Sequence, residues 1–285
     1  MLFTMRHPAR TAWTLTLALL PSLTSDVHAQ VPASRVVSLV PAATELIEAM
    51  GATHLLVGVG RDDDAATTTG LPRLGGPADP SIERILALQP DLVVTWRSIT
   101  GARAIRHLRD AGARVYEARL ETFVDVERTA RDLGRALGRP AAGDSVGDYI
   151  RHALDSLESQ PRDSRPSVLL VLHPESPVLT AGSDTYLSEL VAAAGGRNVF
   201  SDATDSWPRL TSESVLARRP DVVVFAEEDL TDGLLTRLPW RGLRAVRDGR
   251  VMTVPRASLV RPGPASLTMA RKLARFLATV GGGPE

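Results

Sequence analysis

Two tryptophans stand out as possible ligand-binding side chains, because aromatic residues make up only 4% of this 285-residue chain. Trp96 directly follows the strand expected over Asp91 to Thr95, and Trp207 lies in a loop beside Pro208. Either tryptophan alone would be interpreted as an ordinary residue of the hydrophobic core. Two indoles at the edges of separate α/β units instead favour a flat, apolar ligand, which gains buried area and stacking from their faces.

Glu83 and Glu213 form a second pair of related positions, each in the expected first turn of a short helix. The segments around them align without a gap, Ser81 to Val94 on Thr211 to Val224, at a separation of 130 residues. A carboxylate at this place favours the positive end of the helix, usually by under ~1 kcal/mol. Two carboxylates facing outward from separate units can also engage two arginines on a symmetric partner.

The other polar side chains form no catalytic or metal-binding pattern. The chain has no cysteine, which removes disulfides, thiolate metal sites and cysteine nucleophiles. The histidines beyond residue 30 are scattered and never spaced at i, i+4, so zinc binding is not expected. The run Asp62 to Asp64 lacks the glycine and the distal glutamate of a calcium loop, and no Gly-x-Ser-x-Gly elbow is present. We therefore interpret the chain as a binding protein without catalytic residues, metal or cofactor, rather than as a hydrolase.

Charge balance and the N-terminal residues exclude further classes. Lys and Arg number 33, as do Asp and Glu, whereas a nucleic-acid binder needs a clustered excess of basic residues. Residues 1–29 combine Arg6 and Arg10, an apolar run from Thr11 to Leu20, and the ending Val27-His28-Ala29, which predicts a secretory signal peptide. That run is too short to span a bilayer. We expect an exported chain that has no membrane span.

The elements that position these side chains alternate between strands and helices. In the first half we expect strands at residues 35–40, 55–59, 91–96 and 114–116, and helices at 41–51, 81–88, 102–111 and 122–137. A long helix from Ala142 to Gln160 follows, with one apolar stripe. In the second half we expect strands at 167–172, 221–226 and 251–254, and helices at 185–194, 212–218 and 266–280. Strands separated by helices predict parallel sheets covered on both faces.

The predicted fold is α/β, with two Rossmann-like lobes whose parallel sheets are joined by one long helix. We assign residues 34–138 to the N-terminal lobe, 139–161 to the interlobe helix and 166–282 to the C-terminal lobe. Open α/β sheets bind ligands outside the carboxyl ends of their strands, so we expect a cleft between the lobes. The segments expected to border it are Pro41 to Thr44, Asp62 to Asp64, Trp96 to Gly101, Thr180 to Tyr186, Trp207 and Ala257 to Pro264.

With these residues in view, the chain resembles the periplasmic substrate-binding proteins of ATP-driven importers for iron-siderophores, haem and vitamin B12. The resemblance covers about Arg35 to Leu277 and rests on four stretches: Arg35 to Leu46, Glu83 to Val94, Trp96-Arg97 and Trp207 to Glu213. The first two are typical of the whole class, whereas the last two point to its cobalamin-binding members. The resemblance implies a class III periplasmic-binding-protein fold, with a rigid bridging helix and little hinge closure.

The resemblance also implies a ligand and the side chains that hold it. The ligand would be a corrinoid, vitamin B12 (cobalamin), carried as cargo rather than kept as a cofactor. Trp96 and Trp207 match tryptophans that contact the corrin, and Arg261 matches an arginine of the C-terminal ligand loop. Asp62 and Arg97 fall on cleft-loop positions of the family and complete the expected ligand contacts.

The remaining implications concern partners and location. Glu83 and Glu213 match paired glutamates that dock on arginines of the membrane permease in an ABC importer. The resemblance implies a periplasmic protein that passes its cargo to a permease-ATPase complex. We expect a monomer that binds neither nucleic acid nor a membrane.

Several positions depart from the family pattern and leave other cargoes open. The first-loop tyrosine of the family falls near Asp62, a cleft tryptophan becomes Pro77, and a cleft phenylalanine becomes Leu179. Haem relatives often bind iron through that tyrosine. Its absence here makes haem a less favoured cargo but leaves haem open as an alternative. A ferric siderophore would favour cleft arginines, for which there are four candidates: Arg61, Arg97, Arg209 and Arg261. A signalling or scaffold protein would instead have an empty, narrow cleft.

Overall fold

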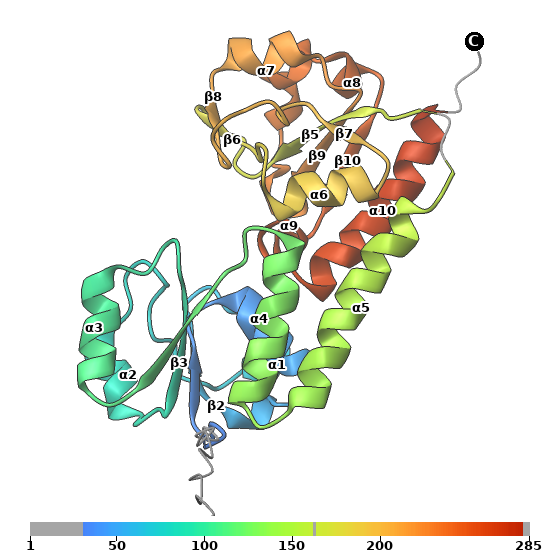
Figure 1. The fold of residues 1–285 in the computed structure, drawn as a ribbon. Coiled ribbons are helices and arrows are strands. Elements are labelled where there is room, and N and C mark those ends of the chain that lie inside the picture. Colours follow the sequence, from blue (N-terminus) through green and yellow to red (C-terminus); the bar gives the residue numbers. More distant parts are fainter. Residues whose placement is uncertain (1–30, 162–163, 282–285) are drawn as a thin grey trace, which may run out of the picture. The chain divides into compact units, whose positions relative to one another are not determined.

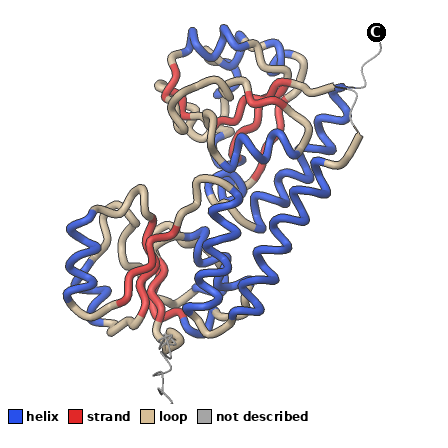
Figure 2. The backbone as a smooth tube through the Cα atoms, viewed as in Figure 1, coloured by secondary structure: helices blue, strands red, loops and turns tan. Residues whose placement is uncertain are grey.

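The fold consists of two α/β lobes, each built on a parallel sheet (Figures 1 and 2). The computed structural model describes residues 31–161 and 164–281, and the predicted signal peptide lies outside these ranges. Within them, the first sheet has the strand order β2-β1-β3-β4 and the second has the order β10-β9-β5-β7. Numbered within its own lobe, each sheet therefore has the order 2-1-3-4. This repetition confirms the twin-lobe α/β fold expected from the sequence.

The strands and helices follow the predicted alternation closely. The strands of the two sheets are β1 (Val36–Ser38), β2 (Leu56–Val59), β3 (Leu92–Trp96), β4 (Arg114–Ala118), β5 (Ser167–Val171), β7 (Arg197–Asn198), β9 (Val222–Ala226) and β10 (Val251–Val254). The helices are α1 (Pro41–Ala49), α2 (Ile82–Ala87), α3 (Ala102–Asp110), α4 (Phe123–Ala136), α5 (Pro140–Glu158), α6 (Tyr186–Ala193), α7 (Ser212–Arg218), α8 (Arg244–Arg247), α9 (Arg256–Val260) and α10 (Pro264–Gly281). None of these helices is long and apolar enough to cross a membrane.

Several short elements were not expected, among them β7 (Arg197–Asn198) and α8 (Arg244–Arg247). A short antiparallel pair, β6 (Val178–Leu179) with β8 (Arg209–Leu210), supplements the parallel sheets of the second lobe. A two-residue strand is too short to show the alternation by which strands are recognised. In addition, α9 forms within the segment from Ala257 to Pro264 that we expected to be a cleft loop.

In each lobe, the aspartate of the internal repeat makes the same hydrogen bonds to a neighbouring strand. Asp91 precedes β3 and accepts hydrogen bonds at Oδ2 from the backbone N–H and the hydroxyl of Ser34, both at 2.8 Å. Asp221 precedes β9 and accepts the equivalent bonds from Ser167 at 2.8 and 2.7 Å. Each aspartate therefore ties the start of one inner strand to the start of its neighbour. This contact explains the aspartate of the repeated Pro-Asp motif.

The interlobe helix α5 is part of the hydrophobic core. It packs against α4 of the first lobe and against α6 and α10 of the second, and Figure 1 shows α10 running alongside it. Ile150 on α5 is fully buried and belongs to one continuous core cluster that includes residues of both lobes. Because apolar burial supplies most of the stability of a fold, separating the lobes would expose part of this shared core.

Two glutamates reinforce the connection between the lobes. Glu45 on α1 accepts a hydrogen bond from the N–H of Ala265, at the start of α10, at 2.6 Å. Glu189 on α6 accepts one from the N–H of Phe123, at the start of α4, at 2.7 Å. A carboxylate from each lobe thus accepts a hydrogen bond from a backbone N–H at the start of a helix in the other lobe. Such N–H groups have no partner within their own helix. Burial raises the pKa of both carboxyl groups, and the two contacts oppose rotation of one lobe against the other.

The contact between α4 and α5 requires glycine. A Cβ at Gly143 would lie 2.8 Å from the carbonyl oxygen of Ala130 and 2.8 Å from the Cα of Gly134. We expect Gly143→Ala to lower the free energy of unfolding by about 1–3 kcal/mol through overpacking, as measured by urea denaturation. Gly101→Ala is the matched control, because a Cβ there meets nothing within 4 Å. Equal losses in the two variants would contradict the tight helix contact.

Candidate ligand-binding site

A hollow of about 620 Å³ is lined by residues of both lobes, a size within the usual range for small-molecule sites. The first lobe contributes Trp96, Ser98, Ile99 and Glu121. The second lobe contributes Leu172, Leu179, Tyr186, Asp205, Ser206, Trp207, Leu259 and Val260. Trp96 ends β3 and Leu172 directly follows β5. The hollow therefore lies at the carboxyl ends of strands, as expected for open α/β sheets.

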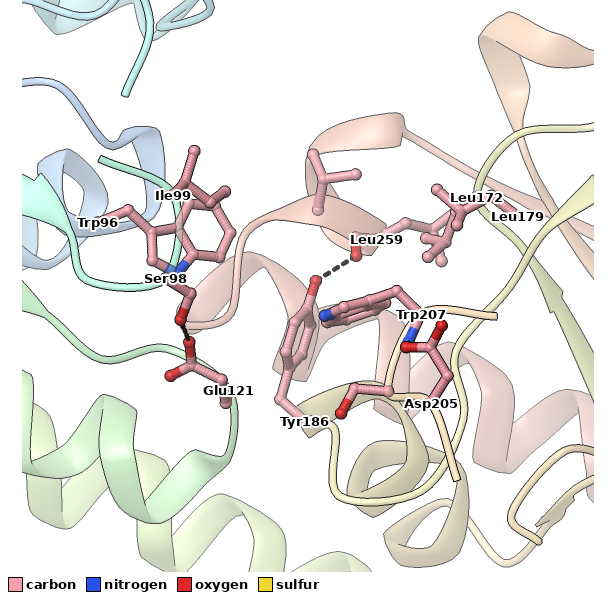
Figure 3. Close-up of a pocket in the computed structure, with 12 residues that line it drawn as sticks. Trp96, Ser98, Ile99, Glu121, Leu172, Leu179, Tyr186, Asp205, Trp207 and Leu259 are labelled. Carbon is pink, nitrogen blue, oxygen red and sulfur yellow. Dashed lines mark hydrogen bonds between the residues drawn. The ribbon is translucent and has the colours of Figure 1, made fainter. Parts of the chain in front are cut away.

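Both predicted tryptophans line this hollow. Figure 3 shows Trp96 on the first-lobe side and Trp207 beside Tyr186 on the second-lobe side. Each indole is partly buried and packs against the shared core instead of being enclosed in it. Both indoles therefore border the hollow, and their contact with a ligand stays a prediction. The fully buried Trp240 instead belongs to a separate core cluster of the second lobe.

Trp207 rests on an aromatic cluster that holds it in place. Its ring lies 6.0 Å from the ring of Tyr186, centroid to centroid, and Tyr186 makes an edge-on contact with Phe123 at 6.2 Å. The hydroxyl of Tyr186 donates a hydrogen bond to the carbonyl oxygen of Leu259 at 2.5 Å (Figure 3). Burial raises the pKa of this phenol. Asp205 adds a further restraint, since its Oδ1 accepts the backbone N–H of Trp207 at 3.0 Å.

The first-lobe wall carries a fixed carboxylate. Glu121 accepts a hydrogen bond at Oε1 from the hydroxyl of Ser98, and another at Oε2 from the N–H of Leu120 at 2.9 Å. Burial alone would raise the pKa of Glu121, but these hydrogen bonds outweigh it and lower the pKa. The indole Nε1 of Trp96 is buried and has no hydrogen-bond partner within residues 31–161 and 164–281. Glu121 is therefore charged at neutral pH.

Sequence reasoning missed Glu121 and the supporting role of Tyr186. Glu121 lies three residues beyond β4, which extends to Ala118 rather than ending at Tyr116 as predicted. Its place just beyond the carboxyl end of β4 is the sequence signal for it, because ligands gather at the carboxyl ends of parallel strands. Tyr186 falls in a segment expected at the cleft, but its contact with Trp207 depends on tertiary packing.

Three other predicted ligand contacts lie outside the lining. Arg261 donates a hydrogen bond to the carbonyl oxygen of Asp62 at 3.2 Å and forms an ion pair with Asp64. Arg97 faces a separate hollow that also contains Tyr116 and several charged side chains. The expectation that Asp62, Arg97 and Arg261 line the cleft is thus not met in this structure, and their contact with a bound ligand stays a prediction.

The two predicted docking carboxylates lie away from the hollow. Glu83 is in the first turn of α2 and Glu213 in the first turn of α7, as expected, and both side chains are exposed. The backbone N–H of Glu213 and the hydroxyl of Thr211 lower the pKa of Glu213. The two residues occupy equivalent positions in the two lobes, which suits a partner that touches both. Their role in docking stays a prediction.

The hollow offers little to an anion or a metal ion. Its only charged lining residues among those described are the carboxylates Glu121 and Asp205. None of the four arginines considered for an anionic cargo lines it. Arg61 pairs with Asp79 at 3.0 Å and Arg261 pairs with Asp64, whereas Arg97 and Arg209 form no ion pair within the described residues. In residues 31–161 and 164–281, no group of three or more His, Cys, Asp or Glu side chains is placed to hold a metal ion. The site is best suited to a large, mainly apolar molecule.

Comparisons with known proteins identify relatives of two kinds. A family model described as "Periplasmic binding protein" matches residues 36–257. The vitamin B12-binding protein of Vibrio cholerae is 28% identical over 247 residues, which cover 86% of this chain and 90% of that protein. The crystal structure of the periplasmic vitamin B12-binding protein of the same species matches with a TM-score of 0.76 and 26% identity, covering 88% of this chain and 99% of that one.

Haem-binding proteins are equally similar in structure. The crystal structure of a periplasmic haem-binding protein from Pseudomonas aeruginosa matches with a TM-score of 0.79 and 25% identity. That match covers 89% of this chain and 95% of the other. Fold similarity alone therefore does not separate the two ligand classes, and the lining of the hollow must do so.

Proposed function

Because the chain belongs to the periplasmic binding protein family, we propose that it captures a corrinoid such as vitamin B12 in the interlobe hollow. The observation that carries the proposal is the pair of indoles, Trp96 and Trp207, on one hollow from two lobes. A corrin is a broad ring with apolar faces, and such a ring gains burial and stacking from indoles. The B12-binding relative, similar along most of its length, supports the same ligand.

In this proposal the protein binds its cargo and performs no reaction on it. Trp96 and Trp207 grip the ring, and Asp62, Arg97 and Arg261 are candidate contacts to its polar rim. The cobalt of a corrinoid carries its own axial ligands, so the protein need not supply one. Among the described residues, the lining holds no histidine, cysteine or methionine. Cobalamin is thus transported cargo and not a cofactor of this chain.

Delivery requires a partner and a compartment. We propose that Glu83 and Glu213 dock on arginines of the permease of an ATP-driven importer. The fold gives them equivalent, exposed positions in the two lobes, which suits a permease with two similar halves. The predicted signal peptide over residues 1–29 would direct the chain to the periplasm, where it would act as a monomer.

Calorimetric titration of the purified protein with cyanocobalamin tests the ligand assignment. We expect a one-site isotherm, accompanied by a shift in the absorbance of the corrin. Cobinamide, which lacks the lower nucleotide, should bind as well, because the indoles contact the ring. Flat isotherms with both compounds would reject the corrinoid while leaving the family assignment intact.

Haem is the second candidate, and one residue favours it. His173 is exposed and directly follows Leu172, a lining residue, and an imidazole is a common axial ligand of haem iron. The phenol of Tyr186 is less suited to that role, because it is buried and bonded to Leu259. Tight haem binding that His173→Ala abolishes, together with no cobalamin binding, would establish haem as the cargo.

A further inference from the structure

We infer that Glu121 selects cargo by charge, accepting hydrogen bonds from N–H groups on the rim of the ring and rejecting rims that carry carboxylates. The inference rests on the proposed function and specifies which corrinoids the hollow takes. A corrin amidated along its rim offers N–H donors, whereas haem and the acid forms of corrins present carboxylates. Glu121 would therefore be a residue that determines specificity, in addition to the tryptophans.

The geometry of Glu121 is the first support. The hydroxyl of Ser98 holds Oε1, and the N–H of Leu120 holds Oε2 at 2.9 Å. Each carboxylate oxygen has two lone pairs, so one protein donor on each leaves acceptor capacity for a ligand. The carboxylate is therefore positioned in advance and need not be reoriented when cargo enters. Figure 3 shows it on the same wall as Trp96.

An unpartnered donor beside Glu121 is the second support. The indole Nε1 of Trp96 is buried and has no hydrogen-bond partner. Because Nε1 has almost no accessible surface, an acceptor on the ligand reaches it only if the indole shifts, and such a shift is favoured because a buried donor without a partner is costly to leave. A primary amide offers N–H to Glu121 and a carbonyl oxygen to Trp96. A carboxylate could accept from Trp96 but would meet the negative charge of Glu121.

The charge of the whole lining is the third support. Asp205 on the opposite lobe adds a second carboxylate, and no lysine, arginine or histidine lines the hollow among the described residues. Arg261, which follows the lining residue Val260, is occupied by Asp64. Like charges repel more strongly in an apolar hollow than in water. An anionic ligand would therefore find no compensating cation among the lining residues.

The test compares two corrinoids, dicyanocobinamide and dicyanocobyrinic acid, by titration at neutral pH. The first carries amides on the rim and the second carries carboxylates. We expect the wild-type protein to prefer the amide form by about a hundredfold or more, and Glu121→Gln to reduce that preference at least about tenfold. Glu121→Asp, which keeps the charge, should retain most of the preference.

Glu117→Gln is the matched control, because Glu117 lies on β4, pairs with Arg109 and faces the other hollow. It should leave the preference unchanged. If Glu121→Gln binds both corrinoids with the wild-type ratio, the inference is wrong even though corrinoid binding stands. If the wild-type protein binds neither cobinamide nor cobalamin, the proposed function fails and the inference fails with it.

Discussion

Replacing either Trp96 or Trp207 by alanine is expected to weaken cobalamin binding by at least about thirtyfold, a loss of ~2 kcal/mol. Both indoles line the hollow from opposite lobes, so each variant removes one of the two faces that hold the ring. Aromatic anchors in the centre of a site carry most of its binding energy. The double variant should bind too weakly for calorimetric detection.

Trp240→Phe is the control for this prediction. Trp240 is buried against Phe225, with ring centroids 4.9 Å apart, and belongs to a different core cluster. Its replacement can reduce stability but should leave cobalamin affinity within about twofold of wild type, because distant sites act independently. Trp207→Phe should retain part of the affinity, since a smaller ring can still pack on Tyr186. Unchanged affinity in both alanine variants would show that the ligand is not held by the indoles.

Removing both Glu83 and Glu213 is expected to abolish docking on the permease while sparing cargo affinity. Close charge pairs at interfaces have coupling energies of about 1.5–7 kcal/mol, so losing one on each lobe should reduce docking by more than about a hundredfold. The measurement is binding of the cobalamin-loaded Glu83→Ala/Glu213→Ala protein to the purified permease-ATPase complex. Cobalamin titration of the same protein checks that the hollow is intact.

Glu158→Ala is a suitable control for docking, because Glu158 is an exposed glutamate at the end of α5 and is not part of the repeated α2 and α7 motif. It should dock as well as the wild type. Single variants should show intermediate docking if the lobes engage the permease independently. Normal docking by the double variant would show that Glu83 and Glu213 do not contribute to the proposed interface.

The repeated architecture could be predicted because its signals are local. In both lobes a short helix leads through Pro-Asp into a buried strand, and the equivalent bonds of Asp91 and Asp221 explain the aspartate of this motif. The helix starting at Pro41 and the restart of the pattern at Ser167 are visible in the same way. Periodicity and end signals of this kind depend on neighbouring residues alone.

The details of the site could be predicted only in part. The position of Trp96 on the hollow could be predicted, because Trp96 ends a strand whose direction is set by the parallel sheet. Arg261 was expected in the cleft but is bound by Asp64, a residue 197 positions away in the sequence. Similarly, the hydroxyl of Tyr186 bonds to Leu259 across 73 positions. Such distant pairings arise from tertiary packing, and no local pattern records them.

The claim that two indoles on separate lobes grip a planar cargo is tested most directly by a crystal structure of the protein with cyanocobalamin. We predict that the corrin lies in the interlobe hollow with Trp96 on one side and Trp207 on the other, each in van der Waals contact with it. A corrin bound elsewhere on the surface, or one in the hollow that touches neither indole, would contradict the account.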